Sequence, residues 1–229
     1  MTKFAYGDLT EAIIGAYYDL YNLTSRTYPE YIYERAMIEE LRRRGIAVTQ
    51  QDEYEITYKG QLVGRQRLDL FVVHEVVVEN KVADQITRLH KAQTISYLKT
   101  VDKPVGLLLN FGGESPDFSR LHFNPAKRSY SLSEDGPRKV RAKSADLLYP
   151  DLCFTIIGGL YEVHSTLGAG FVHRIYANAC WHELRLRHLD VRPGKRIQVA
   201  YRGVVIGDVA FGHIVIEGKI ILWDGSFLG

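Results

Sequence analysis

The chain has 229 residues, of which 46% are hydrophobic and 24% are charged, and its formal net charge is +2. This composition is ordinary for a globular protein and excludes a disordered chain, while the net charge is too small to indicate nucleic-acid binding by itself. No apolar run approaches the roughly 20 residues that a membrane span needs, and the N-terminus has no signal-peptide pattern. We therefore expect a cytoplasmic protein with no part in a membrane.

The first half of the chain predicts helices and strands in the order α-α-β-β-β-α-β-β. Apolar residues at helical spacing predict a helix over 9–22, capped by Asp8, and a second helix from Pro29 in its first turn to Gly45 at its end. The remaining expected elements are strands at 54–58, 62–73 and 75–79 in hairpin succession, a helix at 83–100, a buried strand at 105–109 and an edge strand at 121–123. The expected fold class is α/β (α+β), with a central mixed sheet flanked by helices.

The second half of the chain predicts only the first elements of the same series of helices and strands. Its expected elements are helices at 151–165 and 171–187 and strands at 196–201, 204–216 and 219–223. Between the halves, residues 126–146 contain turn-forming residues and an excess of Lys and Arg, which is typical of a linker. We expect a complete domain at 1–125, a basic linker at 126–146 and an incomplete domain at 147–229.

A shift of 143 positions aligns the two halves without a gap, which indicates a duplication. Among the matched residues are Ile13/Ile156, Gly15/Gly158, Tyr33/Tyr176, Leu41/Leu184 and Gly60/Gly203. The stretch from Lys81 to about Asn124 has no counterpart in the second copy. The second copy is therefore a partial one.

The second copy lacks several charged residues of the first. At the same shift Glu30 is replaced by His173, Glu34 by Ala177 and Asp69 by Gly212. With one extra residue placed at Gly218, Glu79 is replaced by Trp223 and Lys81 by Gly225. Because the apolar pattern survives these losses, the missing carboxylates are poor candidates for residues that hold the fold together.

Two acids of the first copy are expected to lie close together. Asp69 lies in one expected strand, and Glu79 ends the next, so adjacent antiparallel strands can place both carboxylates at one end of the sheet. Two such carboxylates repel each other unless a divalent cation lies between them, and oxygen ligands favour Mg²⁺ or Mn²⁺. Lys81 projects to the same face as Glu79, where its ammonium group can hold an attacking water.

These residues resemble the PD-(D/E)xK nuclease superfamily through Asp69 and Glu79-Asn80-Lys81, followed on the next helix by Gln93 and Tyr97. The sequence is more closely similar to the GxxExxY proteins, whose motif is present as Thr27-Tyr-Pro-Glu30-Tyr-Ile-Tyr33, with Thr in place of Gly. In the second copy it is Gly170-Phe-Val-His173-Arg-Ile-Tyr176, with Glu lost. The resemblance covers residues 8–124 and, as a fragment, 151–217, and it implies a metal-dependent nuclease fold.

The first functional hypothesis is a Mg²⁺-dependent (or Mn²⁺-dependent) phosphodiesterase that acts on nucleic acid, either DNA or RNA. Asp69 and Glu79 bind the metal with the Asn80 carbonyl, Glu30 or Glu34 is the helix acid, Lys81 orients water and Gln93 supports the site. Each has an alternative: Glu30 and Glu34 as a solvated helix face, Gln93 as a polar helix position and Tyr97 as a packing aromatic. The second hypothesis is a non-catalytic nucleic-acid- or protein-binding or regulatory module.

The incomplete second copy also predicts how its exposed sheet is covered. Its strands carry apolar surface. In the first copy the corresponding surface is covered by a helix and a strand that the second copy lacks. Apolar surface left exposed to water costs about 25 cal/mol of folding free energy per Å². We expect this surface to pack in a homodimer or in a two-lobed monomer, with no preference between them.

Overall fold

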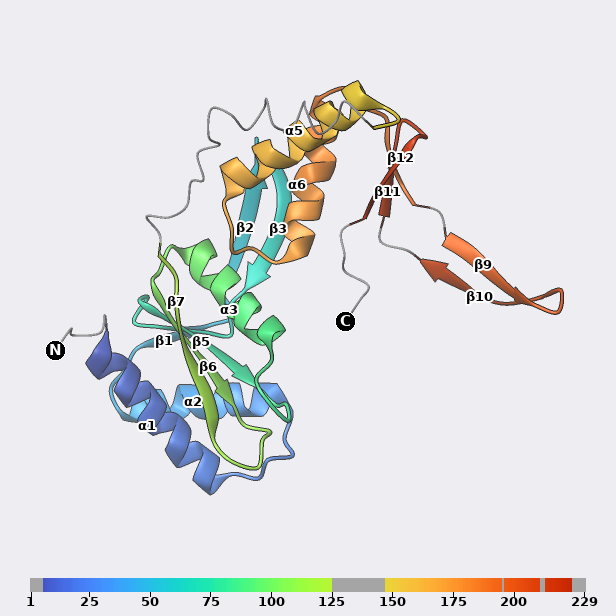
Figure 1. The fold of residues 1–229 in the computed structure, drawn as a ribbon. Helices are drawn as coiled ribbons and strands as arrows, with labels where there is room; N and C mark the ends of the chain where they lie inside the picture. Colours follow the sequence, from blue (N-terminus) through green and yellow to red (C-terminus); the bar gives the residue numbers. More distant parts are fainter. Residues whose placement is uncertain (1–5, 125–146, 195, 211–212, 224–229) are drawn as a thin grey trace. The chain divides into compact units, whose positions relative to one another are not determined.

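The computed structural model describes residues 6–124, 147–194, 196–210 and 213–223, which form two compact units (Figure 1). The first unit consists of Met1–Thr57, Gly64–Arg128 and Ala169–Val172. The second consists of Tyr58–Val63, Ser129–Gly168 and His173–Gly229. Each unit thus includes a short segment from the other half of the sequence. The expected linker at 126–146 lies outside the described residues.

A mixed five-stranded sheet forms the centre of the first unit. Its strands lie in the order β1 (Val48–Gln50), β4 (Leu70–Val72), β5 (Val76–Lys81), β6 (Val105–Asn110) and β7 (Asp117–His122). Strands β5 and β6 are parallel, whereas the other neighbours are antiparallel. This mixed sheet with flanking helices confirms the predicted α/β (α+β) class.

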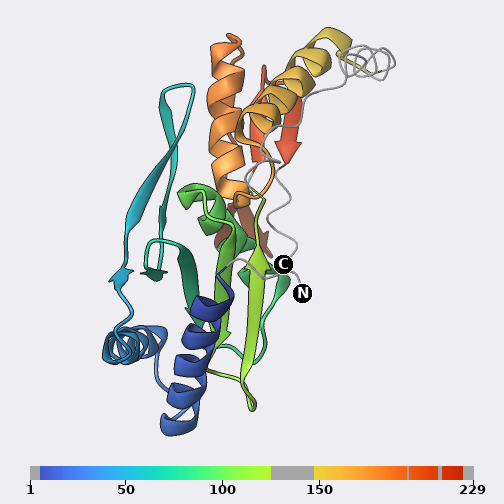
Figure 2. The same ribbon diagram turned by 90° about the vertical axis from the view of Figure 1, so that its left-hand side faces the viewer.

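Helices cover both faces of this sheet (Figures 1 and 2). Helices α1 (Gly7–Leu23) and α2 (Glu30–Arg43) pack on one face in a core that includes Val76 and Val78. Helix α3 (Arg88–Val101) packs on the other face in a core that includes Val77. Because side chains alternate along β5, the residues that follow Val77 on its face, Glu79 and Lys81, lie on the α3 side.

The predicted strand at 62–73 and the predicted hairpin succession are wrong. Strand β3 (Gln61–Arg67) pairs only with β2 (Glu53–Tyr58), in a separate two-stranded sheet, and β4 begins a second sheet at Leu70. The chain changes sheets at Leu68 and Asp69, whose backbone groups bond with Asp52 and Gln51 beside β1. Strand β1 has only three residues, too few to show a period in the sequence.

Two helix starts also differ from the prediction. Helix α1 begins at Gly7 with Tyr6 at its N-cap, so Asp8 is not the cap but lies in the first turn, where its charge favours the helix dipole. Helix α3 begins at Arg88, because the Thr87 hydroxyl accepts a hydrogen bond from the His90 backbone N–H and caps it there.

The segment after β5 is held against the end of β6. The Asn110 amide accepts from the backbone N–H groups of Ala83 (3.0 Å) and Gly112 (3.2 Å) and donates to the Ala83 carbonyl (2.8 Å). Gly112 lies so close that a Cβ there would be 2.6 Å from the Ala83 nitrogen. This close backbone contact holds the chain in place at the end of β5, where Lys81 lies.

The second unit contains α5 (Pro150–Leu167) and α6 (His173–Leu186). Its three-stranded sheet has the order β12 (Ile220–Trp223), β11 (His213–Ile216) and β8 (Val191–Pro193), and β9 (Arg196–Tyr201) pairs with β10 (Val204–Ala210) in a separate hairpin. The predicted strand at 204–216 is therefore also divided between two sheets. No helix in the described part of the chain is both long and apolar enough to cross a membrane.

The elements of the first unit recur in the second, and strand register refines the sequence alignment. Helix α6 has the same 14-residue length as α2, and its bounds differ by the 143-residue shift. Leu70 pairs with Val78, while Ile214 pairs with Leu222, so β11 and β12 are shifted by 144 residues. The extra residue therefore precedes β11 rather than lying at Gly218. The counterpart of Asp69 is His213, not Gly212.

Replacing Gly112 with Ala should destabilise the first unit by about 1–3 kcal/mol, because the added methyl group meets rigid backbone at Ala83. Urea denaturation of the full chain measures the change in the free energy of unfolding. Gly7→Ala is the matched control, since no atom lies within 4 Å of a Cβ at Gly7. Equal stability of the two variants would contradict the close contact.

Candidate active site

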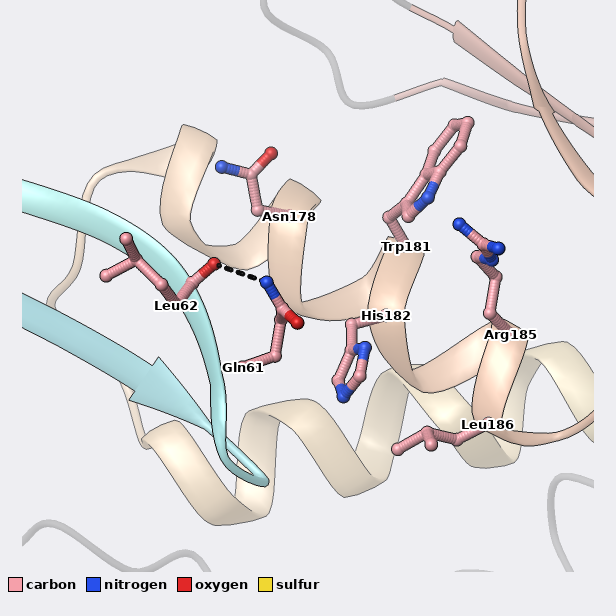
Figure 3. Close-up of a pocket in the computed structure, with 7 residues that line it drawn as sticks. All are labelled: Gln61, Leu62, Asn178, Trp181, His182, Arg185 and Leu186. Carbon is pink, nitrogen blue, oxygen red and sulfur yellow. Dashed lines mark hydrogen bonds between the residues drawn. The ribbon is translucent and has the colours of Figure 1, made fainter.

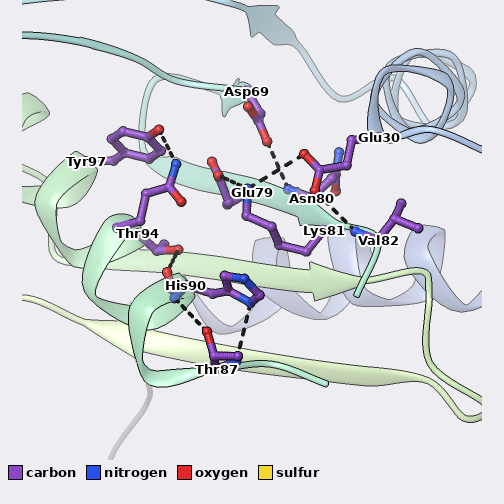
Figure 4. A network of polar contacts seen from close by, with 11 residues as sticks. Glu30, Asp69, Glu79, Asn80, Lys81, Val82, Thr87, His90, Thr94 and Tyr97 are labelled. Atoms are coloured by element: carbon purple, nitrogen blue, oxygen red, sulfur yellow. Dashed lines mark hydrogen bonds and ion pairs between the residues drawn. The ribbon is translucent and has the colours of Figure 1, made fainter. Parts of the chain in front are cut away.

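Asp69 and Glu79 face each other across the β4–β5 pair. Leu70 is opposite Val78 in the register, so Asp69 and Glu79 are the next facing positions toward the end of the sheet. Facing Cβ atoms in such a pair lie about 4.5–5.5 Å apart. Figure 4 shows both carboxylates beside Lys81 and Glu30, which comes from the start of α2. The structure thus brings together four residues that the sequence predicted for the site.

Lys81 and the backbone of β5 connect these acids. The Lys81 ammonium nitrogen lies 2.6 Å from Glu79 Oε1 and 3.8 Å from Glu30 Oε2. The Asn80 backbone N–H donates to Asp69 Oδ2 (3.1 Å), and the Val82 backbone N–H donates to Glu30 Oε1 (3.3 Å). Helix α2 and strands β4 and β5 therefore hold one polar cluster at the sheet end (Figure 4).

Burial makes the acid pair difficult to ionise. Glu79 is only 1% exposed, and burial, followed by the negative charge of Asp69, raises its pKa to about 8 although Lys81 acts in the opposite direction. Burial also raises the pKa of Asp69. The pKa of Tyr97 is raised to about 12, first by burial and then by the charge of Glu79. Without a cation, the pair therefore retains a proton near neutral pH.

The residues present fit a hard divalent cation. Glu79 Oε2 is buried and accepts no hydrogen bond from an N–H or hydroxyl donor in the described part of the chain, so its neighbour in place of a donor is the Asp69 carboxyl group. Facing carboxylates of this kind suit Mg²⁺, which keeps several waters and needs only one or two carboxylates from the protein. Within residues 6–124 and the other described segments, no three His, Cys, Asp or Glu side chains form a metal-binding group. Water and backbone oxygens would have to complete the coordination.

Asn80 lies on the opposite side of β5 from the acids. It is fully buried, and neither Oδ1 nor Nδ2 of its side chain has a hydrogen-bond partner among the described residues. A buried amide without partners costs folding free energy. Its backbone carbonyl as a metal ligand stays a prediction.

Two acids of α2 face the cluster. Glu30 contacts Lys81 and Val82, as described above. Burial, followed by the charge of Asp69, raises the pKa of Glu34, while a hydrogen bond with the Gln51 side chain lowers it. Gln51 was not predicted, because it follows a three-residue strand that has no sequence signal. Both helix acids remain candidates by position.

The tyrosine of the GxxExxY-like motif has a structural role. The Tyr33 hydroxyl donates to the Ser25 carbonyl, and its ring stacks on Phe111 with 4.4 Å between centroids. In the second unit, the Tyr176 hydroxyl donates in the same way to the Gly168 carbonyl. Both tyrosines thus fix the loop before their helix, in the second unit without an acid at the position of Glu30.

Gln93 contacts Tyr97, whose pKa responds to the charges of the cluster. Its Nε2 donates to the Tyr97 hydroxyl (2.6 Å), one turn along α3. Tyr97 is 8% exposed and packs in the α3 core with Val77 and Leu98. The structure therefore gives Tyr97 both a packing contact and a polar contact.

The second unit has no carboxylate at the corresponding positions. His173, Ala177, His213 and Trp223 replace Glu30, Glu34, Asp69 and Glu79 in turn. A cavity of about 440 Å³ is lined by Leu160, His173, Tyr176, Ala177, Asn178, Cys180, Trp181, His213, Ile214 and Leu222. A second cavity, of about 610 Å³, lies between the β2–β3 tip and α6 (Figure 3). Neither cavity is lined by the acids of the first unit.

Unfolding at different pH values tests the burial of Glu79. Between pH 4.5 and 8 the unfolded chain releases the Glu79 proton while the folded chain keeps it, so the free energy of unfolding should fall as pH rises. The fall is at most about 1.4 kcal/mol per pH unit for one proton. Glu79→Gln should remove this dependence in urea denaturation with EDTA present.

The exposed Glu11→Gln variant of α1 is the control and should keep the wild-type pH dependence. An unchanged slope in Glu79→Gln would show that this carboxyl group titrates at its ordinary pKa.

Comparison with known proteins identifies the family. No curated protein matches the chain. One similar solved structure, described as "Crystal structure of SSO0001", is 18% identical, with a TM-score of 0.36. The match covers 53% of this chain and 62% of that protein's length. The family "PD-(D/E)XK nuclease superfamily" matches residues 7–121 and 150–223, which is most of the sequence. The chain therefore belongs to the PD-(D/E)XK nuclease superfamily.

Proposed function

We propose that the first unit is a Mg²⁺- or Mn²⁺-dependent nuclease that hydrolyses phosphodiester bonds of nucleic acid. The observation that carries this proposal is the buried Asp69–Glu79 pair, in which Glu79 Oε2 accepts no hydrogen bond from a protein donor and the Lys81 ammonium group lies beside Oε1. A stable ion pair alone does not require two facing acids in a buried position, where their repulsion costs free energy. A cation between them offsets this cost.

Asp69, Glu79 and the Asn80 carbonyl would hold the cation. When bound, such an ion polarises a phosphoryl oxygen and lowers the pKa of a water that it binds. Lys81 would then turn from Glu79 toward the attacking water, donate a hydrogen bond to its oxygen and balance the negative charge on the phosphoryl oxygens in the transition state. Its ammonium nitrogen lies 2.6 Å from Glu79 and 3.8 Å from Glu30, which supports this role.

Glu30 is the proposed helix acid. Its carboxylate is near Lys81 Nζ and accepts from the Val82 backbone, so it can keep Lys81 oriented and accept a proton from water. Gln93 supports the site through its hydrogen bond with Tyr97. Glu34, which is close to Asp69 and Gln51, is the alternative helix acid.

The second copy supports this division of roles and the proposed duplication. It keeps the helices, the strand register and the motif tyrosine, but it has no acid at the four corresponding positions. Its motif, like that of the first copy, supports a closer relationship to the GxxExxY proteins within the superfamily. The second unit therefore has no hydrolytic role in this proposal.

One observation favours a second candidate function, a non-catalytic module that binds nucleic acid or protein. No third His, Cys, Asp or Glu side chain joins Asp69 and Glu79 in a metal-binding group within the described segments. In this alternative, Lys81 and the proton that the pair retains near neutral pH together neutralise the acids, and no cation binds. DNA and RNA are both open as partners in either case.

Asp69→Asn, Glu79→Gln and Lys81→Met should each lower metal-dependent cleavage by at least about 100-fold. The first two remove a carboxylate from the metal, and the third removes the ammonium group, while each keeps the side-chain size. Cleavage of a panel of labelled DNA and RNA oligonucleotides with Mg²⁺ or Mn²⁺ measures the rates, and circular dichroism checks the fold.

Glu11→Gln is again the control and should retain full activity. Among the helix acids, Glu30→Gln should lower the rate more than Glu34→Gln. Wild-type cleavage by any of the first three variants would rule out the proposed site.

Metal binding separates the two candidate functions. Mn²⁺ at about 100 times its dissociation constant should raise the free energy of unfolding by about 2.7 kcal/mol in the wild type, because only the folded chain holds the site. Asp69→Asn should lose this shift in thermal denaturation, whereas Glu11→Gln should keep it. No shift in the wild type would favour the non-catalytic module.

A further inference from the structure

The hairpins β2–β3 and β9–β10 have the same tip. Each has a two-residue loop in which both residues have positive φ, at Lys59 (46°) and Gly60 (81°) and at Arg202 (50°) and Gly203 (82°). This is the type I′ geometry that suits the twist of a hairpin. In both, the cation lies over the preceding tyrosine ring, at 5.5 Å for Lys59 on Tyr58 and 5.4 Å for Arg202 on Tyr201.

The β2–β3 tip is docked on α5 and α6 within the second unit (Figure 3). The Tyr58 hydroxyl donates to Glu183 Oε2 (2.9 Å), and Lys59 Nζ lies 2.8 Å from the same oxygen. Lys59 Nζ is also 3.3 Å from Glu162 on α5, and Asn178 donates to the Val63 carbonyl (2.7 Å). One cation and one hydroxyl group thus bind a pair of acids.

The first unit contains the same acceptor site at the corresponding positions. Glu183 corresponds to Glu40 on α2, and Glu162 corresponds to Asp19 on α1. The basic neighbour is also repeated, since Arg44 Nε is 2.8 Å from Glu40 Oε1 and Arg187 Nε is 2.9 Å from Glu183 Oε1. Arg44 also pairs with Asp19. With two acids and one arginine, this site has one net negative charge, as the second-unit site has without Lys59.

The two acceptor sites differ in whether a hairpin covers them. The Glu183 and Glu162 side chains are 3% and 44% exposed at the docked β2–β3 tip, whereas their counterparts Glu40 and Asp19 are 22% and 60% exposed. The hairpins differ in the same way. Tyr58 and Val63 are 1% and 2% exposed, but their counterparts Tyr201 and Ile206 are 60% and 65% exposed. Val204 and Val205 extend this exposed apolar surface.

We propose that the β9–β10 hairpin of one chain docks on the Glu40–Asp19 site of a second copy of this chain. The Arg202 guanidinium group would contact both carboxylates, as Lys59 contacts Glu183 and Glu162, and the Tyr201 hydroxyl would donate to Glu40. The contact neutralises the net negative charge of the site and covers the apolar residues of the hairpin.

A second copy is the occupant because every chain carries both parts of the contact, the hairpin tip in its second unit and the acceptor site in its first unit. Two chains related by a two-fold axis supply each other with both, so the contact is made twice and the assembly closes. This inference does not depend on nuclease activity, since none of its residues belongs to the Asp69–Glu79 site.

Sedimentation velocity of the full chain tests the proposal. The wild type should sediment as a dimer, and Arg202→Glu should shift it to the monomer with at least a tenfold rise in the dissociation constant. Arg174→Glu, which makes the same charge change at an exposed position of α6, should remain dimeric. A monomeric wild type, or a dimer that Arg202→Glu leaves unchanged, would overturn the proposal.

A charge exchange between two chains identifies the occupant. Glu40→Arg alone should also be monomeric, because it places a second guanidinium group opposite Arg202 in both contacts. A mixture of the Arg202→Glu chain with the Glu40→Arg chain should form a heterodimer, since one contact has the exchanged charges and the other is wild type. Circular dichroism confirms that both variants are folded. A mixture that stays monomeric would overturn docking on a second copy.

Discussion

The pairing of β4 with β5 is the constraint on which the candidate site depends. Its register places two acids opposite each other at the end of a sheet whose central strands are buried on both faces. Burial raises the pKa of both acids, and Lys81 offsets only part of their repulsion. A fold normally avoids such an arrangement, because ionising both groups costs free energy. The proposed cation explains it, since the carboxylates then become ligands.

Comparison of the two units separates residues that shape the fold from residues of the proposed site. Tyr33 and Tyr176 both fix the loop before a helix, so this position is needed in each copy. Glu30 has a contact with Lys81 in the first copy only, and its counterpart is His173. The pairs Arg44–Glu40 and Arg187–Glu183 have nearly the same geometry. The second unit therefore has the same helix pair and hairpin acceptor as the first but not the acid cluster.

The β2–β3 and β9–β10 hairpins share the geometry of their tips. The segment Tyr58–Val63 belongs to the second unit, although it lies in the first half of the sequence. Its contacts with Glu183 and Glu162 show what the Tyr-Lys-Gly tip binds, and the Tyr-Arg-Gly tip of β9–β10 has the same backbone and ring geometry. An exposed apolar hairpin is a liability for aggregation unless a partner covers it. Association of two chains through this tip removes that liability.

The sequence by itself determined the fold class and the order of most elements, and it predicted that Glu30, Asp69, Glu79 and Lys81 belong to one site. Periodicity carries the order of elements, because helix faces and strand faces repeat every few residues, whereas the resemblance to a nuclease superfamily indicated the site residues. The sequence did not show the division of 62–73 between two sheets, the three-residue β1, the Gln51 contact or His213 as the counterpart of Asp69. Those depend on strand pairing between distant segments, which only the tertiary structure decided. The burial that raises the pKa of Glu79 is also a property of the packed sheet and helices, and no local pattern encodes it.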